Sequence, residues 1–223
     1  MHLPRAEELF DLGHTKAREL ISEKKNIYEA LLNLKSFIVN LGNQLPKDEY
    51  DEISPEVWVA KDSVISPMAT ILPPTVIGHN TEVRPGAFIR GSVLIGDGAV
   101  IGNSSEIKNA VIFDGVQLPH YNYVGDSILG YRSHLGAGAI ISNFRLDHRN
   151  IKIRSDSEFI ETGLRKLGAL IGDFAEIGCN SVVFPGTVIG RGTLVYPLTS
   201  VRGTVPAGVI MKSDGTMEKI KFI

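Results

Sequence analysis

The segment Ile71–Ile112 reads ILPPTVIGHNTEVRPGAFIRGSVLIGDGAVIGNSSEIKNAVI, and a bulky β-branched residue recurs in it every six positions. The same phase extends outward to Val59 and Phe113, and its first nine positions hold only isoleucine or valine. It returns between Ile171 and Val201. A small residue or a valine follows each of the first nine bulky residues four positions later. Chance does not produce this regularity, so the six-residue period decides the fold.

A period of six indicates a solenoid in which each hexad forms one short strand and one turn. The bulky residue points into the core, and the small residue fits a tight corner. Steps such as Ile77-Gly78 and Ile95-Gly96 suit turns that need an unencumbered backbone. Three hexads close one triangular coil of about 18 residues. The sequence therefore predicts a mainly β protein that is built as a parallel β-helix.

The composition excludes several other classes of protein. The 23 basic and 25 acidic residues give a net charge of −2, which disfavours binding to nucleic acid or to a membrane surface. Cys179 is the single cysteine, so a disulfide framework and a site made of thiolates alone are excluded. We see neither a signal peptide nor an apolar run long enough to span a membrane, so we expect a cytoplasmic protein.

The first 50 residues differ from the rest of the chain. They contain nine leucines, two glycines, and eleven lysines and glutamates, a composition that favours helix. We predict helices over residues 4–22 and 26–41, followed by a linker over 42–56. Residues 1–50 would then form an N-terminal helical hairpin with its linker, used for packing or oligomerisation. Residues 51–223 would form the β-helix.

Two stretches interrupt the six-residue phase, and solenoids commonly carry their function where the repeat departs from its pattern. The first is 117–127, where the register slips before it resumes at Leu129. The second is 144–169, which we predict to be an inserted loop containing a β-hairpin that projects from the prism. The tail from Pro206 to Ile223 is expected to cap the end of the solenoid.

The first interruption contains a candidate for acid–base chemistry. His120 lies among polar and aromatic residues where the repeat breaks, which suits a general base, although a lone histidine is more often an ordinary hydrogen-bonded residue. Arg84 and Lys108 each follow an inward residue and are separated by four hexads, so they lie on adjacent faces or bridge neighbouring subunits. Two cations near a base suit an anionic substrate such as a sugar phosphate, and the alternative is that both are solvated surface charges.

Four ordered motifs add a resemblance to these observations. They are Arg84-Pro85-Gly86-Ala87, Glu106-Ile107-Lys108, His120-x-x-Tyr123-x-Gly125-Asp126, and Gly136-Ala137-Gly138 with Asn143 shortly after it. Together they resemble the acetyltransferase half of the bifunctional glucosamine-1-phosphate acetyltransferase and N-acetylglucosamine-1-phosphate uridylyltransferase, a hexapeptide-repeat enzyme. The likeness covers roughly residues 70–143 and 170–205. It implies a left-handed β-helix and a homotrimer whose sites lie between neighbouring prisms.

The resemblance also implies roles for individual residues. His120 would take a proton from the amine of the acceptor, which then attacks the thioester of acetyl-CoA directly. The substrate-binding residues would be Arg84, Glu106, Lys108, Tyr123, His134 and Asn143. The residues in contact with CoA would be Ala137, Cys179, Pro197 and Lys212. The stretch 136–138 could also stabilise the oxyanion through backbone N–H groups.

The chain departs from the family pattern at several of these positions. His134 stands where the family has asparagine, and Cys179 stands where it has serine. Lys212 is only the nearest match to a basic CoA contact. The uridylyltransferase half has no match in the sequence, so we expect no nucleotidyltransferase activity. We expect no metal requirement either.

Three alternatives stay open at this point. The first is a zinc-dependent hydratase resembling the gamma-type carbonic anhydrases, which would draw its ligands from His79, His120, His134 and His148. The short His-x-x-x-x-His step of that family is absent from this sequence. The second is a non-catalytic scaffold or a protein that binds a sugar nucleotide, because fold alone does not imply function. The third is an acyltransferase with a different amino acceptor.

Overall fold

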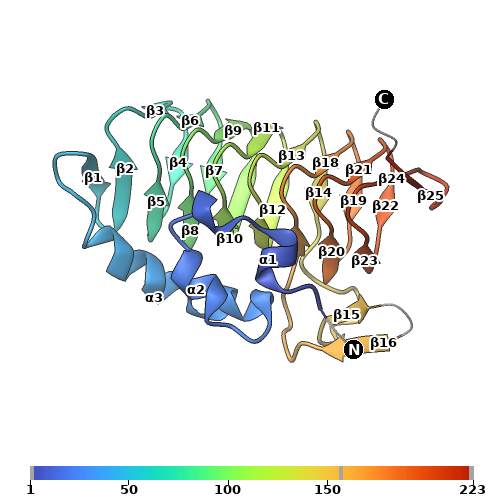
Figure 1. Cartoon of the computed structure of the whole chain (residues 1–223). Helices are drawn as coiled ribbons and strands as arrows, with labels where there is room; N and C mark the ends of the chain where they lie inside the picture. The colour runs from blue at the N-terminus through green and yellow to red at the C-terminus, as the bar shows by residue number, and fades with distance from the viewer. Residues whose placement is uncertain (1–2, 156–157, 221–223) are drawn as a thin grey trace.

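The predicted solenoid is confirmed in the computed structural model, which describes residues 3–155 and 158–220. The chain winds as a left-handed parallel β-helix with three faces, and it passes in each coil from the first face to the third and then to the second (Figure 1). Bulky residues of the hexad phase, such as Ile77, Ile95 and Ile101, point inward and are completely buried. The six-residue period therefore corresponds to the residues that point into the core from each face.

Each face is a ladder of short parallel strands, except that β10 and β12 each continue from the second face onto the first. The first face contains β2 (Val57–Ala60), β5 (Thr75–Ile77), β8 (Val93–Ile95), the ends of β10 (Glu106–Ile112) and β12 (Tyr123–Leu129), β17 (Ala169–Ile171), β20 (Thr187–Ile189) and β23 (Thr204–Val205). The second face contains β4 (Thr70–Ile71), β7 (Phe88–Ile89), the starts of β10 and β12, β14 (Ile140–Ile141), β19 (Val182–Val183) and β22 (Ser200–Val201). The third face contains β3 (Val64–Ile65), β6 (Glu82–Val83), β9 (Val100–Asn103), β11 (Gln117–His120), β13 (His134–Leu135), β18 (Glu176–Ile177), β21 (Leu194–Val195) and β24 (Val209–Met211).

Small polar residues at the corners explain the second half of the sequence period. Thr81 Oγ1 donates a hydrogen bond to the carbonyl of Gly96 (2.8 Å), and Ser105 Oγ donates to the carbonyl of Leu118 (2.9 Å). Both hydroxyl side chains are buried. A larger side chain would not fit there, and a residue without a hydroxyl would leave buried carbonyls with fewer partners.

The N-terminal segment differs from the helix predicted over 4–22. It forms α1 (Ala6–Leu9), the short 3₁₀-helix η1 (Leu12–His14) and α2 (Arg18–Ser22). Residues 9–16 instead run along the corner between the first and third faces. Asp11 N–H donates to Asp173 Oδ2 (2.6 Å), His14 C=O accepts from Asp114 N–H (3.1 Å), and Lys16 Nζ lies 3.2 Å from Asp97 Oδ1.

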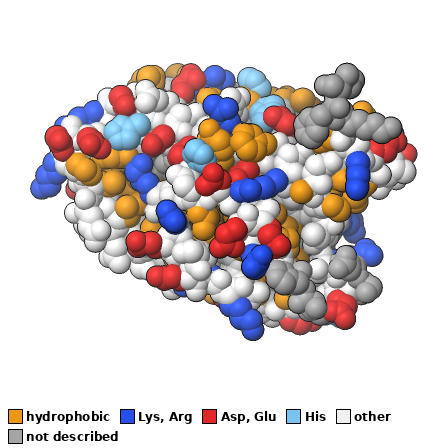
Figure 2. All heavy atoms as spheres, in the orientation of Figure 1, with side chains coloured by type: hydrophobic (Ala, Val, Ile, Leu, Met, Phe, Trp, Pro, Cys, Tyr) orange, Lys and Arg blue, Asp and Glu red, His pale blue; other side chains and the backbone are white. Residues whose placement is uncertain are grey.

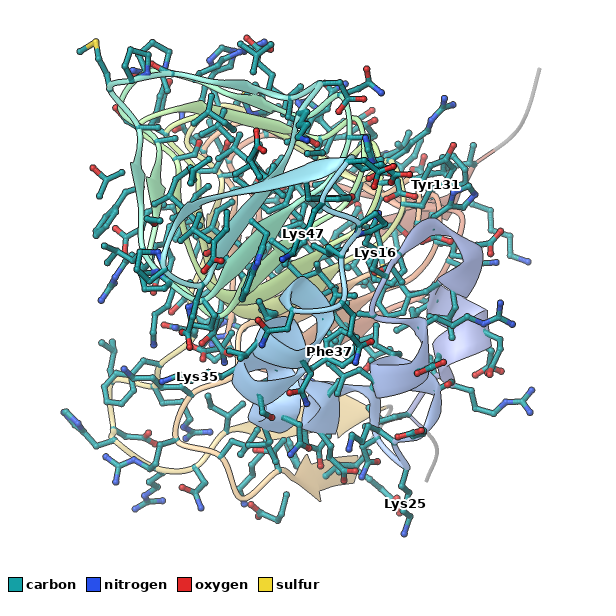
Figure 3. All side chains as sticks on the ribbon, turned by 90° about the vertical axis from the view of Figure 1, so that its left-hand side faces the viewer. Lys16, Lys25, Lys35, Phe37, Lys47 and Tyr131 are labelled. Atoms are coloured by element: carbon teal, nitrogen blue, oxygen red, sulfur yellow. The ribbon has the colours of Figure 1, made fainter. Side chains whose placement is uncertain are left out.

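A continuous helix would satisfy those backbone groups internally, so binding to successive coils of the prism breaks it. Figure 3 looks along the solenoid and shows Lys16 and Tyr131 at this corner. The second predicted helix is present as η2 (Ile27–Glu29) and α3 (Ala30–Gly42), and α3 packs on β5, β8 and β10 of the first face. The helices and the prism share one hydrophobic core, and a division into domains at residue 50 stays a prediction.

The second half of the predicted linker is wrong, because β1 (Tyr50–Ser54) pairs antiparallel with β2. The slip predicted over 117–127 begins earlier than expected, because Ile112 rather than Phe113 pairs with the inward residue Ile95, so the phase has already shifted before Gln117. Phe88 pairs with Glu106, which lies three full hexads later, whereas Val93 pairs with Ala110, which lies one position short of three hexads. One residue is therefore missing at the corner where the second face meets the first, and another is missing at the same corner one coil later, because Ala110 pairs with Ser127.

The insert forms a β-hairpin of β15 (Lys152–Ser155) and β16 (Glu158–Glu161), as predicted. It does not simply project, because Ile151 and Ile153 are fully buried against the prism. At the C-terminal end, β25 (Met217–Lys219) pairs antiparallel with β24 and covers the last coil. The end of the predicted cap, 221–223, lies outside the described residues.

Charged side chains of both signs are interspersed over the face shown in Figure 2. Within residues 3–155 and 158–220, no helix combines the length and the hydrophobicity that a membrane crossing requires.

Candidate active site

The predicted base and three of the predicted CoA contacts lie in one row. Leu118, Leu135, Ile177 and Val195 are successive inward residues of the third face, and Leu135 pairs with Ile177, which pairs with Val195. The residues two positions later therefore stack on consecutive coils at the corner between the third and second faces. We call this set the His120 row: His120, Ala137, Cys179 and Pro197. Adjacent members are about 4.8 Å apart along the prism.

Lys212 lies one coil further along and one position before the row, because Val195 pairs with Met211. Its Nζ forms a short ion pair with Glu218, which raises the pKa of Lys212 and keeps it charged. Its place at the end of the row agrees with a contact to the far end of an extended cofactor, and that contact stays a prediction.

The His120 side chain is exposed to solvent on a rigid backbone. Its N–H donates to Asn122 Oδ1 (3.2 Å), and its carbonyl accepts from Gly138 N–H (3.1 Å). The amide of buried Asn122 in turn donates to the Gly136 carbonyl (2.8 Å). Within the described residues, the imidazole itself has no hydrogen-bond partner. Both ring nitrogens are therefore available to a ligand.

Of the three backbone N–H groups in the turn after β13, at residues 136–138, one is a candidate donor to an oxyanion. Gly136 N–H donates to the Ile177 carbonyl, and Gly138 N–H donates to the His120 carbonyl. Within the described part of the chain, Ala137 N–H makes no hydrogen bond. Ala137 is the neighbour of His120 in the row, so its N–H lies on the next coil from the imidazole.

A second group of polar residues lies across the second face, at its corner with the first face. We call it the Asp126 cluster: Lys108, Asn109, Tyr123, Asp126 and Asn143. Asp126 is 6% exposed and accepts hydrogen bonds from Asn109 Nδ2 (2.8 Å) and Asn143 Nδ2 (2.5 Å). Lys108 Nζ lies 3.9 Å from Asp126 Oδ2. The missing corner residues bring these side chains together, because their absence lets β10 and β12 run straight through the corner.

Tyr123 is the member of this cluster that starts β12 on the second face, and its hydroxyl and the Asn143 amide nitrogen lie 2.7 Å and 2.5 Å from the position that a Cβ on Gly125 would take. Burial, with a smaller contribution from the negative charge of Glu106, raises the pKa of Tyr123 above its usual value near 10. The phenol is therefore fully protonated at neutral pH and can donate a hydrogen bond.

Arg90 is a candidate site residue that the sequence analysis did not include. Ile89 pairs with Ile107, so Arg90 lies directly beside Lys108 on the preceding coil. Arg90 Nη1 lies 2.6 Å from Glu106 Oε1. Two adjacent cations at the edge of one face, with a phenol donor on the next coil, can bind a phosphate. The signal was present in the sequence, since Arg90 precedes Lys108 by three hexads, which is one full coil.

The predicted partner of Lys108, Arg84, lies elsewhere in the chain. Arg84 follows β6 at the corner of the His120 row, and its Nη2 pairs with Glu82 Oε2 (3.0 Å). That hydrogen bond lowers the pKa of the Glu82 carboxyl. Arg84 and Lys108 therefore occupy opposite edges of the second face, which agrees with the expectation of adjacent faces. A shared substrate contact between them stays a prediction.

His134 lies at the start of β13 on the third face, where its Nδ1 contacts Glu176 Oε2 (2.7 Å). It lines an open groove with Gln117, Arg132 and Phe174. Substrate contact by His134 is not tested by this arrangement.

The other histidines proposed as zinc ligands are dispersed. His79 pairs with Asp62 (3.0 Å), and His148 stacks edge-on against Phe144 in the insert. No cluster of three or more potential metal ligands occurs among the residues that the structure describes.

Comparisons with known proteins agree with the fold. The family model described as the GMPPB C-terminal domain matches residues 71–162. A bifunctional sugar-1-phosphate nucleotidylyltransferase/acetyltransferase of Sulfurisphaera tokodaii is 34% identical over 176 residues. The match covers 79% of this chain and 43% of that protein, so the chain spans less than half of the bifunctional relative.

Two further relatives are named acetyltransferases. Among solved structures, a putative acetyltransferase of Bacillus cereus aligns with a TM-score of 0.40 and 16% identity, covering 74% of this chain and 77% of the other. The putative uncharacterized acetyltransferase YaiX of Escherichia coli K12 is 33% identical over 189 residues, which are 85% of this chain and 80% of YaiX. On this near full-length match, and with its hexad-built prism, the protein belongs to the hexapeptide-repeat acyltransferases.

Proposed function

We propose that this protein transfers the acetyl group of acetyl-CoA to the amine of an amino-sugar phosphate, with glucosamine 1-phosphate as the first acceptor to test. The observation that carries the proposal is the pairing of two edges of one face. At one edge, the imidazole of His120 has no hydrogen-bond partner among the described residues. At the other edge, Arg90 and Lys108 lie next to each other, and the protonated phenol of Tyr123 lies on the next coil.

The phosphate of the acceptor would bind to Arg90, Lys108 and Tyr123. Arg90 and Lys108 each have a carboxylate nearby, from Glu106 and Asp126, which holds the cations in place. Asn143 would contact the sugar. This arrangement favours a phosphorylated acceptor over a neutral amino sugar, because a charged donor strengthens each hydrogen bond to an anion.

The chemistry follows from an amine next to a thioester. An ammonium has no lone pair, so the acceptor first loses one proton to solvent, and the imidazole of His120 takes a second proton from the nitrogen as it attacks. The nitrogen then forms a bond to the thioester carbonyl carbon, and Ala137 N–H donates to the resulting oxyanion. The carbon–sulfur bond breaks, the amide forms, and the CoA thiolate takes a proton from the imidazolium. Acetyl-CoA would lie along the His120 row, with Lys212 at the far end.

We further propose that the protein is a homotrimer. Large apolar side chains are exposed along the corner of the His120 row, including Met68 (72%), Tyr121 (57%) and Leu198 (74%). Isolated exposed apolar residues are common, but a row of them along one edge marks a contact surface. Light scattering of the purified protein should give three times the mass of 24.3 kDa.

The test of the function is release of the CoA thiol with a panel of acceptors. We expect turnover with glucosamine 1-phosphate and weaker turnover with glucosamine. If no amine in the panel is acetylated, the protein is a scaffold or a binding protein. If glucosamine exceeds its phosphate, the proposed anion site is wrong.

A further inference from the structure

We propose that Asp126 is a positioning residue which fixes the hydrogen-bond polarity of Asn143 and Tyr123, so that the Tyr123 hydroxyl is free to donate to the acceptor. This inference rests on the proposed function for its substrate, although the orientation of the side chains can be tested without turnover.

The first step concerns the groups that bond to Asp126. An ionised carboxylate can only accept hydrogen bonds, so an amide that bonds to it must present its nitrogen. Asn143 Nδ2 lies 2.5 Å from Asp126 Oδ2, and Asn109 Nδ2 lies 2.8 Å from Oδ1. Reversing the Asn143 amide would bring its oxygen against a buried negative charge. Asp126 therefore selects one of the two orientations of that amide.

The second step concerns the other proton of the same nitrogen. A side chain built onto Gly125 would meet Asn143 Nδ2 at 2.5 Å and the Tyr123 hydroxyl at 2.7 Å, so these two groups face each other over the glycine. The atom of Asn143 that faces Tyr123 is the amide nitrogen, which can only donate, so the hydrogen bond between the two side chains runs from Asn143 to the phenol oxygen, and it works to lower the pKa of Tyr123. Asn143 therefore donates to both Asp126 and Tyr123.

The consequence is a directed chain of hydrogen bonds. Because the Tyr123 oxygen accepts from Asn143, its own proton points away from the cluster. Burial keeps that proton on the phenol. Without this constraint, the Tyr123 hydroxyl could rotate and donate its proton to Asn143 instead. With Asp126 in place, the phenol is set as a donor toward an anion held by Arg90 and Lys108.

The same residues also anchor the insert, so a test must separate positioning from folding. Asp126 C=O accepts from Gly168 N–H (2.8 Å), and Asn143 C=O accepts from Leu167 N–H (3.1 Å). These are backbone bonds, which a change of the Asp126 side chain to asparagine preserves in principle. Thermal unfolding of every variant checks that they are preserved.

The experiment is a polarity swap between positions 109 and 126. Asp126→Asn gives residue 126 one donor and one acceptor, so either orientation of Asn143 becomes acceptable. In the double variant Asn109→Asp with Asp126→Asn, the new carboxylate at 109 accepts from the amide nitrogen at 126. The oxygen at 126 then faces Asn143 and restores its original orientation without a change of net charge. Asn109→Gly is the matched control, because it leaves Asp126 intact and glycine accepts the left-handed φ of 46° at this position.

We expect Asp126→Asn to raise the KM for glucosamine 1-phosphate about tenfold or more, since one charge-assisted hydrogen bond supports a discrimination of that size. The double variant should return to within about threefold of the wild type, and Asn109→Gly should change KM about twofold at most. The kcat values should change less than KM, because the proton transfer at His120 is untouched.

A second readout needs no turnover. The side-chain amide protons of Asn143 should be protected from hydrogen exchange in the wild type, exchange at least about tenfold faster in Asp126→Asn, and regain protection in the double variant. If the wild type acetylates no amine but the exchange follows this pattern, the acceptor is wrong and the polarity is right. If a folded Asp126→Asn protein matches the wild type in both readouts, or the double variant fails to recover, Asp126 has no positioning role.

Discussion

Replacing Gly125 with alanine tests the geometry of the Asp126 cluster through a single methyl group. The added Cβ would lie 2.5 Å from Asn143 Nδ2 and 2.7 Å from the Tyr123 hydroxyl. Ordinary contacts of a Cβ begin near 3.4 Å, so both side chains must retreat by about 1 Å. The backbone of Gly125 does not have the positive φ that disfavours other residues, so the clash itself carries the effect.

The expected magnitude follows from the bond that is lost. Moving Asn143 away breaks its bond to the Asp126 carboxylate, which contributes about 1.5–3 kcal/mol. The alanine returns about 0.4–1 kcal/mol by restricting the unfolded chain. We therefore expect a net loss of about 1–2 kcal/mol, or a fall in Tm of about 2–8 °C. The kcat/KM for glucosamine 1-phosphate should fall at least about tenfold.

The assay pairs thermal unfolding with steady-state kinetics and uses Gly98→Ala as the control. Gly98 has open space around its Cβ position but a φ of +64°, so alanine there costs about 1 kcal/mol of backbone strain without touching the site. Gly98→Ala should lower Tm and leave KM unchanged. A Gly125→Ala protein with a normal Tm and a normal KM would refute the tight crossing of Tyr123 over Asn143.

Three further changes test other parts of the structure. His120→Ala should lower kcat about 10²–10⁴-fold while Tm stays the same, because the imidazole makes no hydrogen bond within the described chain; equal turnover would remove it from the mechanism. Arg90→Ala should raise the KM for the phosphorylated acceptor more than Arg84→Ala does, and the opposite ranking would return the phosphate to the corner of the His120 row. Burial raises the pKa of Asp114, so its protonated carboxyl favours the folded state below the unfolded pKa near 3.8, and that contribution is lost as pH rises through the folded value. In denaturant titrations, the free energy of unfolding should therefore fall less in Asp114→Asn than in the wild type as pH rises from about 3.8 to neutrality. If it falls equally in both proteins, the pKa of Asp114 is not raised in the folded state.

The repeating part of the fold could be predicted because a solenoid uses the same local physics in every coil. Each inward isoleucine or valine is buried by the coils on either side, so the sequence must repeat with the structure. The row of His120, Ala137, Cys179 and Pro197 follows from that register once a coil length is assumed. The resemblance supplied their roles, and the structure supplied their alignment.

The features that failed are those in which distant contacts override local preference. Residues 9–16 have a helical composition, yet Asp173 and Asp114 draw their backbone groups onto the prism. No local pattern predicts that residues 9–16 bind along the prism, because their partners are about a hundred residues or more away in the chain. The strand β1 was missed for the same reason, since its pairing with β2 depends on the solenoid beginning there.

Arg90 shows a different kind of failure. Its position one coil before Lys108 was visible, but the motif around Arg84 drew attention to a residue four hexads away. In a triangular coil, a separation of three hexads places two side chains on the same edge, and a separation of four hexads places them on different edges. Arithmetic on the coil length is therefore a better guide to neighbours than the similarity of short motifs.

The Asp126 cluster exists because the repeat is one residue short at the same corner in two successive coils. Asn109 and Asp126 take left-handed φ values of 46° and 49° there, which lets β10 and β12 turn the corner without a loop. Their side chains consequently stack directly above one another, and Asn143 continues the stack where the insert departs. A full coil of three hexads would separate these groups by a turn and leave the carboxylate at the surface. The shortened coils thus convert a structural repeat into a buried, directional set of hydrogen bonds at one edge of an otherwise regular prism.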